Sequence, residues 1–232
     1  MQPHISALVD YFSYELPKLE KNYEWKIPKI AGFKDSGKND YLSNVSLKKF
    51  LHECWTRTNG DGERLKIASL VVKDWGGVKN NKLETLKKYV DELISDLPST
   101  PIKGVASYSK IFSIANLDKY AIYDARVAAC LNAVQWNFGV KGLAFNYIPG
   151  RNNTTGHSGK RIGFVYQEQF KTESLISCGW GEIEKEKTYE TYLKVLKECH
   201  SHFENYNLYD LEMVLFANAG TECRKAIKSI NG

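Results

Sequence analysis

Hydrophobic side chains recur at helical spacing along most of the chain. From Ser46, which suits a helix N-cap, the apolar residues at positions 47, 50, 51, 54 and 55 fall on one helical face. The Asn- and Gly-containing turn at residues 59–62 ends this helix, and a second helix is expected over residues 63–74. The Trp75-Gly76-Gly77 sequence then interrupts the pattern. This part of the chain therefore predicts helices joined by glycine turns.

The same periodicity predicts helices through the rest of the chain. Leucine and valine at positions 83, 86, 90, 93 and 97 form an amphipathic helix that Pro98 stops. Further helices are expected over residues 104–114, from the residue after Asp124 to Phe138, and over residues 188–203 and 209–230. The predicted fold class is mainly α, with no obvious linker that divides the chain.

One long segment departs from the helical pattern. Residues 139–163 are rich in Gly, Asn and Thr, and they include the sequence Pro149-Gly150-Arg151-Asn152-Asn153. This composition predicts an exposed loop, and a loop of this length in a compact domain usually has a function. Short strands over residues 143–148 and 161–166 are equally compatible with the sequence.

The distribution of charge adds a possible partner to this picture. The chain has 232 residues, of which 43% are hydrophobic and 25% charged, and its net charge is +5. This hydrophobic fraction is too high, and this net charge too low, for a disordered chain. Residues 125–167 contain five Lys and Arg but no Asp or Glu. Such a stretch is typical of a surface that binds a polyanion, although a buried helix within it would also need few charges.

Other features of the composition narrow the class of protein. No apolar run approaches the roughly 20 residues of a membrane span, so no membrane partner is expected. Five widely spaced cysteines without a CxxC pair, and a start without a signal-peptide pattern, indicate reduced thiols and a cytoplasmic location. The Cys and His residues near the C-terminus match no zinc spacing, and no nucleotide-binding motif is present. Neither a metal nor another cofactor is therefore predicted.

The segment from Ile102 to Val127 carries the most chemical information. A glycine turn at Gly104 opens into a helix, and backbone N–H groups at a helix N-terminus suit a phosphate. Lys110 lies in that helix, and Asp124 precedes the next helix, where Asp is also a favoured N-cap. The two side chains are therefore expected to face one pocket, although a solvated lysine and a simple cap remain alternatives.

These residues resemble the helix-hairpin-helix DNA glycosylases, and more closely the bacterial 8-oxoguanine DNA glycosylase-like family. The resemblance is carried by Ile102-Lys103-Gly104-Val105-Ala106-Ser107-Tyr108-Ser109-Lys110 and by Ile122-Tyr123-Asp124-Ala125-Arg126-Val127. Residues 72–78 and 209–217 are similar to the same family. The resemblance implies one glycosylase-like domain over residues 1–232, with an N-terminal extension at 1–44, a helix-hairpin-helix and catalytic segment at 82–138, and a cleft between two helical lobes.

The function implied by the resemblance is excision of a damaged or modified base, with an oxidised purine expected, from double-stranded DNA. The target nucleotide would leave the duplex for a pocket, because its glycosidic bond is inaccessible within the stack. Asp124 would stabilise the positive charge that develops on the sugar. Lys110 would attack the sugar carbon and form a Schiff base, which allows a lyase step at the resulting abasic site. The backbone of Gly104, Val105 and Ala106 would hold DNA phosphates.

The spacing of the segment departs from the superfamily in ways that concern Lys110. Lys110 lies two positions beyond the usual lysine, whose place Tyr108 occupies, and Ala106 replaces the second hairpin glycine. Two residues correspond to about 200° of rotation around a helix. Either the hairpin is remodelled so that Lys110 still points inward, or the chain is not a lysine-nucleophile enzyme.

Further contacts and rival functions complete the expectations. Trp75 is a candidate wall of the base pocket, or alternatively a core residue. The basic residues expected near DNA are Arg126, Lys79, Arg151, Lys160 and Arg161. The rival functions are a non-catalytic DNA-binding module of a repair or phage-defence system, and an interaction protein of a genome-defence system whose fold is only a scaffold.

Overall fold

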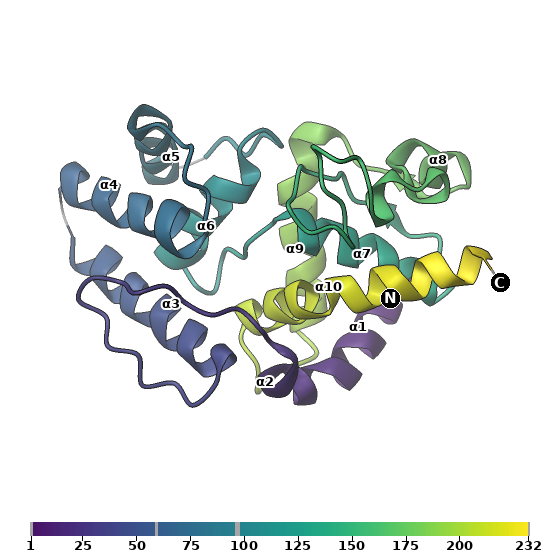
Figure 1. Cartoon of the computed structure of the whole chain (residues 1–232), viewed down its shortest axis with the longest axis horizontal. Coiled ribbons are helices and arrows are strands. Elements are labelled where there is room, and N and C mark those ends of the chain that lie inside the picture. The colour runs from purple at the N-terminus through teal and green to yellow at the C-terminus, as the bar shows by residue number, and fades with distance from the viewer. Residues whose placement is uncertain (1, 59, 96–97, 232) are drawn as a thin grey trace.

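The computed structural model describes residues 2–58, 60–95 and 98–231, and this part of the chain is mainly helical (Figure 1). The mainly α fold class is therefore confirmed. In chain order the elements are α1 (Pro3–Glu15), η1 (Leu16–Lys18), α2 (Leu19–Asn22), α3 (Asp40–Arg57), α4 (Asp61–Ser69), η2 (Leu70–Trp75), α5 (Leu83–Ile94), α6 (Val105–Ala115), α7 (Ala125–Asn137), β1 (Leu143–Ala144), η3 (Phe164–Tyr166), η4 (Glu168–Phe170), α8 (Thr172–Ser177), β2 (Gly181–Glu182), η5 (Lys185–Lys187), α9 (Thr188–His200) and α10 (Leu208–Asn231).

The helices fall into two groups that share one hydrophobic core. Figure 1 shows α3, α4, α5 and α6 on one side and α1, α7, α8, α9 and α10 on the other. In the second group α10 packs along α7, while α1 contacts α7 and α9. The main core cluster contains buried side chains from both groups, among them Leu47, Phe112, Val127 and Leu211. The two groups of helices are therefore packed together through their buried side chains.

The first predicted helix is longer than the sequence suggests. The helix α3 begins at Asp40, and its N-cap is Asn39, whose side chain accepts a hydrogen bond from Leu42 N at 2.9 Å. The prediction of Ser46 as the cap is therefore wrong, because Asn39 offers an equally good capping side chain further upstream. The predicted apolar face is correct at its centre, since Leu47 and Leu51 are buried.

The second predicted helix contains an irregular turn at its end. The helix α4 passes directly into the π-helical turn η2, where Gly76 N donates to Val71 O at 2.9 Å, five residues earlier. Trp75 belongs to this turn, and the chain leaves it at Gly77, which has a φ of 66°. The next helix, α5, ends at Ile94, and the predicted apolar position 97 lies outside the described residues.

The predicted loop at residues 139–163 is only partly exposed. Leu143 and Ala144 form β1, which pairs in parallel with Gly181 and Glu182 of β2. The Asn132 side chain bonds to both the N–H and the carbonyl of Phe145, which is fully buried. The first half of the segment is therefore part of the core, and only the second half is a surface loop. Residues 161–166 form no regular strand: Ile162 makes only an isolated bridge with His157, and residues 164–166 form the 3₁₀ turn η3.

Candidate active site

Lys110 and Asp124 line the same pocket. It lies where α3, η2, α6 and α10 meet the segments at residues 23–25 and 122–124, and it holds about 70 Å³. The lining residues are Tyr23, Trp25, Lys48, Trp75, Gly76, Lys110, Ile122, Asp124, Glu212 and Phe216. The structure therefore places the lysine and the aspartate at one pocket, as the sequence predicts, with Trp75 in its wall.

Lys110 points into the protein rather than into solvent. Its side chain is 8% exposed, and Nζ donates a hydrogen bond to the carbonyl oxygen of Ala106, one turn earlier in α6. Gly76 lies against the same side chain, because a Cβ atom at Gly76 would be 2.7 Å from Lys110 Cδ. Burial lowers the pKa of Lys110 from its ordinary value, against the opposing effect of the Asp124 carboxylate. More of this lysine is therefore the neutral amine, which is the nucleophilic form.

Tyr108, at the position of the usual lysine in the family that the sequence resembles, points elsewhere. Its hydroxyl donates to the carbonyl oxygen of Pro101 at 2.8 Å, and its ring packs edge-on against Tyr189. Tyr108 is therefore a core residue between Pro101 and α9. Lys110, two residues later, lines the pocket instead, so it points inward.

Gly104 determines how α6 begins. Its φ is 87°, in the left-handed region that favours glycine, and a Cβ atom there would lie 2.1 Å from the hydroxyl oxygen of Tyr89. Gly104, Val105 and Ala106 line a second hollow, of about 430 Å³, with residues 146–149 and Lys185. The predicted phosphate-binding backbone is therefore brought to a hollow of its own and does not line the pocket of Lys110.

Asp124 is the N-cap of α7, as the sequence predicts. Its Oδ1 accepts hydrogen bonds from Arg126 N at 2.9 Å and from Val127 N at 3.0 Å. Both bonds use the same oxygen, so the cap does not require the second carboxylate oxygen. The side chain is half-buried and lines the pocket. Capping and a role at the pocket are therefore compatible, because the cap fixes the position of the carboxylate.

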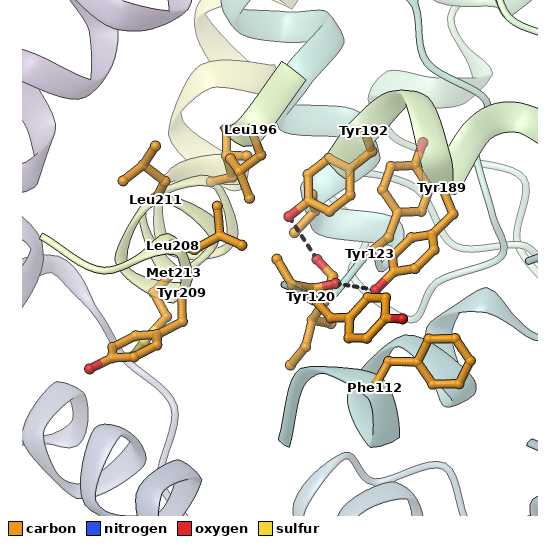
Figure 2. Close-up of a cluster of buried hydrophobic side chains, with 14 of the residues drawn as sticks. Phe112, Tyr120, Tyr123, Tyr189, Tyr192, Leu196, Leu208, Tyr209, Leu211 and Met213 are labelled. Carbon is orange, nitrogen blue, oxygen red and sulfur yellow. Dashed lines mark hydrogen bonds between the residues drawn. The ribbon is translucent and has the colours of Figure 1, made fainter. Parts of the chain in front are cut away.

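The extended run that leads to Asp124 is held by side chains from two helices. Tyr189 and Tyr192 of α9 donate hydrogen bonds from their hydroxyls to Ala121 O at 2.9 Å and Ile122 O at 3.0 Å (Figure 2). On the other side, Tyr123 N donates to the hydroxyl oxygen of Ser109 at 3.1 Å. Ser109 directly precedes Lys110 in α6. The backbone before the aspartate is therefore tied to the helix that carries the lysine.

A buried ion pair forms another side of the pocket. Lys48 Nζ of α3 lies 2.5 Å from Glu212 Oε2 of α10, and the two side chains are 1% and 3% exposed. Burial raises the pKa of Glu212 from its ordinary value, and the Lys48 cation acts in the opposite direction. Because the partners are far apart in the sequence, their pairing joins the two groups of helices at the pocket.

Aromatic side chains supply the apolar walls. Trp75 is 4% exposed, and its Nε1 donates to Asn44 Oδ1 at 2.9 Å, so it is both a core residue and a pocket wall. Trp25 and Phe216 pack edge-on with ring centroids 5.6 Å apart. The guanidinium of Arg126 lies 4.4 Å from the Phe216 ring centroid, in cation–π geometry. The predicted basic residue Arg126 is thus placed beside the aromatic wall.

The predicted basic loop residues are only partly brought together. Arg151 Nη1 donates to Gly77 O at 3.3 Å, so the loop after residue 148 touches the glycine turn that follows η2. Lys79 is exposed in that turn. Lys160 and Arg161 are exposed further along the loop, where Arg161 has a φ of 50°, and neither lines the pocket.

Several pocket residues are absent from the sequence-based candidates, among them Trp25, Lys48, Glu212 and Phe216. The signal for two of them lies in the helical pattern. Lys48 falls on the same face of α3 as the buried Leu47, Leu51 and Trp55, and Glu212 follows the buried Leu211 in α10. A charged residue on a buried helix face requires a partner, because an unpaired buried charge is costly. The pattern therefore indicates a buried pair, but it does not identify which residues form it.

Comparison of the chain with known protein families, with curated proteins and with solved structures finds no match in any of the three. Within residues 2–58, 60–95 and 98–231, no group of three or more His, Cys, Asp or Glu side chains is placed to hold a metal ion. Over the same residues, none of the helices is both long and apolar enough to cross a membrane.

Proposed function

We propose that this protein is a DNA glycosylase that removes a damaged or modified base, with an oxidised purine as the expected substrate class. The observation that carries the proposal is the convergence of a buried lysine and a helix-capping aspartate on one pocket with aromatic walls. The proposed fold is of the helix-hairpin-helix type, with α5 and α6 as the two helices and the turn at Gly104 as part of the hairpin.

Lys110 is the nucleophile in the proposed mechanism. The lone pair of Nζ forms a bond to the sugar C1′, the glycosidic bond breaks, and its electron pair leaves with the base, which takes up a proton. Opening of the sugar ring then gives a Schiff base between C1′ and Nζ. Burial supports this role, because it favours the amine that carries the lone pair. The Schiff base in turn acidifies the C2′ proton, so loss of that proton and of the 3′ phosphate cleaves the strand.

Asp124 supplies the negative charge in this mechanism. As the base departs, positive charge develops on the sugar, and a fixed carboxylate stabilises it without reorganisation. The two hydrogen bonds from the N-terminus of α7 hold the carboxylate, and the hydroxyls of Tyr189 and Tyr192 hold the chain before it. These contacts support a carboxylate that is in place before the substrate enters.

The pocket has to open to admit a base. Its volume of about 70 Å³ has space for a few water molecules, so a flipped base displaces both water and part of a wall. Trp25 is a wall residue outside regular secondary structure, and it is half-buried. We therefore assign Trp25 as the side chain that moves when a base enters. Its ring then stacks on the base.

The proposed DNA contacts surround the pocket. The backbone from Gly104 to Ala106 would hold phosphates at the second hollow. Arg126 stands at the aromatic wall, and Arg151 connects the basic loop to the turn that carries Lys79. Contacts from Lys160 and Arg161 would extend the same cationic surface along the backbone of the duplex.

A panel of duplexes that each contain one modified base tests the proposal. The panel includes oxidised purines and hypermodified bases, and strand scission after alkali reports base removal. Lys110→Gln and Asp124→Asn should each abolish or strongly reduce excision, because Gln lacks the amine lone pair and Asn retains the cap without the charge. Exposed residues supply the matched controls, Lys228→Gln and Asp118→Asn, and these should leave excision unchanged.

Trapping with borohydride examines the covalent step separately. Reduction of the Schiff base should yield a stable adduct between the wild-type protein and DNA, and Lys110→Gln should yield none. A trapped adduct in Lys110→Gln would remove the lysine assignment. Full excision by a normally folded Asp124→Asn would show that the proposed mechanism is wrong, and DNA binding without turnover across the whole panel would indicate a non-catalytic binding module.

A further inference from the structure

Two lysine and two carboxylate side chains from four different parts of the fold line the pocket. Lys110 comes from α6, Lys48 from α3, Asp124 from the start of α7 and Glu212 from α10. Trp75 of η2 and the following Gly76 also line the pocket, and neither residue has an ionisable side chain. Tyr23 also lines the pocket, and burial raises its pKa well above the ordinary value, so it stays neutral.

The pairing among these groups is selective. Glu212 forms its ion pair with Lys48 and not with Lys110, whose Nζ instead bonds to the neutral carbonyl of Ala106. The Lys48 ammonium is further held by aromatic rings, 5.9 Å from the Trp75 centroid and 5.5 Å from the Tyr209 centroid. The Lys48 ammonium is therefore enclosed by the Glu212 carboxylate and by two aromatic rings.

Removal of Lys48 would leave a buried carboxylate without its partner. The Glu212 side chain is 3% exposed, and burial of a charged carboxylate costs free energy unless a cation or several hydrogen bonds compensate the charge. Lys110 lines the same pocket, where the Asp124 and Glu212 carboxylates raise its pKa and the Lys48 cation lowers it, so removal of Lys48 would leave Lys110 facing two carboxylates without that opposing cation. Lys110 would then be held as an ammonium ion, which has no lone pair for attack on a sugar carbon.

We propose that Lys48 is a positioning residue for Lys110: by holding the Glu212 carboxylate, it leaves the Lys110 amine with a free electron pair. The inference rests on the proposed function for its use in catalysis, but its effect on Lys110 does not require DNA. Because Lys48 and Glu212 form an ion pair, the Asp124 carboxylate has no compensating cation in the pocket whenever Lys110 is the neutral amine. This charge is of the sign that stabilises a positively charged sugar.

The test measures the titration of Lys110 in the free protein. Reductive methylation with formaldehyde and cyanoborohydride, performed over a range of pH, labels only neutral amines. Mass spectrometry of the Lys110 peptide, normalised to the exposed Lys228, gives the pH of half-maximal labelling. The wild type should label Lys110 with a midpoint below 10.5, the ordinary value for lysine. Lys48→Met should raise the midpoint by about one pH unit or more, the size of shift expected from a nearby opposite charge.

The double variant separates this role from a merely structural one. Lys48→Met with Glu212→Gln removes one cation and one anion, so the Lys110 midpoint should return to within a few tenths of a pH unit of the wild type. Replacement of a buried pair by neutral residues is also tolerated better than removal of one partner, which keeps the double variant folded. Lys49→Met, at the exposed neighbouring position on α3, is the matched control and should leave the midpoint unchanged.

Two results would overturn the inference: an unchanged midpoint in Lys48→Met, or a raised midpoint that the double variant does not restore. If Lys48→Met does not fold, Glu212→Gln decides, because loss of the anion should lower the Lys110 midpoint below the wild-type value, and an unchanged midpoint would contradict the inference. If the wild type excises no base while the midpoints shift as expected, the proposed function fails and the inference on Lys48 stands. If the wild type excises a base while the midpoints do not respond, the inference on Lys48 fails and the proposed function stands.

Discussion

Substitution of Gly76 offers a sharp test of how Lys110 is positioned. Gly76 has φ −79° and ψ −8°, which any residue adopts, so Gly76→Ala introduces no backbone strain of its own. Its new Cβ would lie 2.7 Å from Lys110 Cδ and 2.9 Å from Cε. Carbon atoms in contact are ordinarily about 3.5–4.0 Å apart, so the lysine side chain has to move by about 1 Å. Val71 O, 3.0 Å from the same Cβ, limits a shift of the turn in compensation.

A displacement of about 1 Å in a catalytic group can reduce a rate about 100-fold. We therefore expect Gly76→Ala to form the borohydride-trapped adduct about 100-fold more slowly than the wild type, in single-turnover experiments on a substrate from the lesion panel. Gly62→Ala is the matched control, because a Cβ atom there has no neighbour within 4 Å, and it should trap at the wild-type rate. Wild-type trapping by a normally folded Gly76→Ala would refute the argument that the close approach of this glycine sets the position of Lys110.

Three further predictions concern stability and DNA binding. Asp124→Ala should lower the free energy of unfolding, measured in urea, by about 1 kcal/mol, because the helix cap is lost. Asp124→Asn should lower it less, because Asn is also a good cap. A larger loss in the Asn variant than in the Ala variant would contradict the capping geometry. Because burial lowers the pKa of Lys110, the unfolded chain binds more protons between that pKa and 10.5, and wild-type stability rises with pH in this window. Lys110→Met should therefore have a higher free energy of unfolding in urea than the wild type at pH 7. The difference between the two proteins should shrink toward pH 10.5. A variant less stable than the wild type at pH 7 would argue against a desolvated lysine. Arg151→Ala should reduce the slope of log affinity for DNA against log salt concentration by about 1, because one phosphate contact is lost. Lys228→Ala, at an exposed position, is the control and should leave the slope unchanged. An unchanged slope for Arg151→Ala would place this residue away from phosphate.

The residues predicted best from the sequence are those whose position depends on local geometry. Asp124 caps its helix because the capping bonds reach only two and three residues ahead. Gly104 has the positive φ that a tight turn before a helix requires. These features follow from short-range rules, and the structure reproduces them.

The features that the sequence does not reveal depend on distant segments. The Lys48–Glu212 pair joins residues that are 164 positions apart, and helical periodicity carries no information about such pairings. Trp25 lies on a segment without periodicity, and it reaches the pocket because Asn44 donates a hydrogen bond to its carbonyl at 2.7 Å. The start of α3 is ambiguous for a simpler reason, since Asn39 and Ser46 are both acceptable caps and the downstream apolar face does not distinguish them.

The π-helical turn η2 makes the pocket sensitive to the number of residues in this part of the chain. It accommodates one residue more than an α-helical turn, and one residue corresponds to about 100° of rotation around a helix axis. Loss of one residue between 70 and 75 would restore regular winding and swing both Trp75 and Gly76 away from Lys110. We therefore expect deletion of one residue in this turn to disrupt the pocket, even though every residue that lines it is retained.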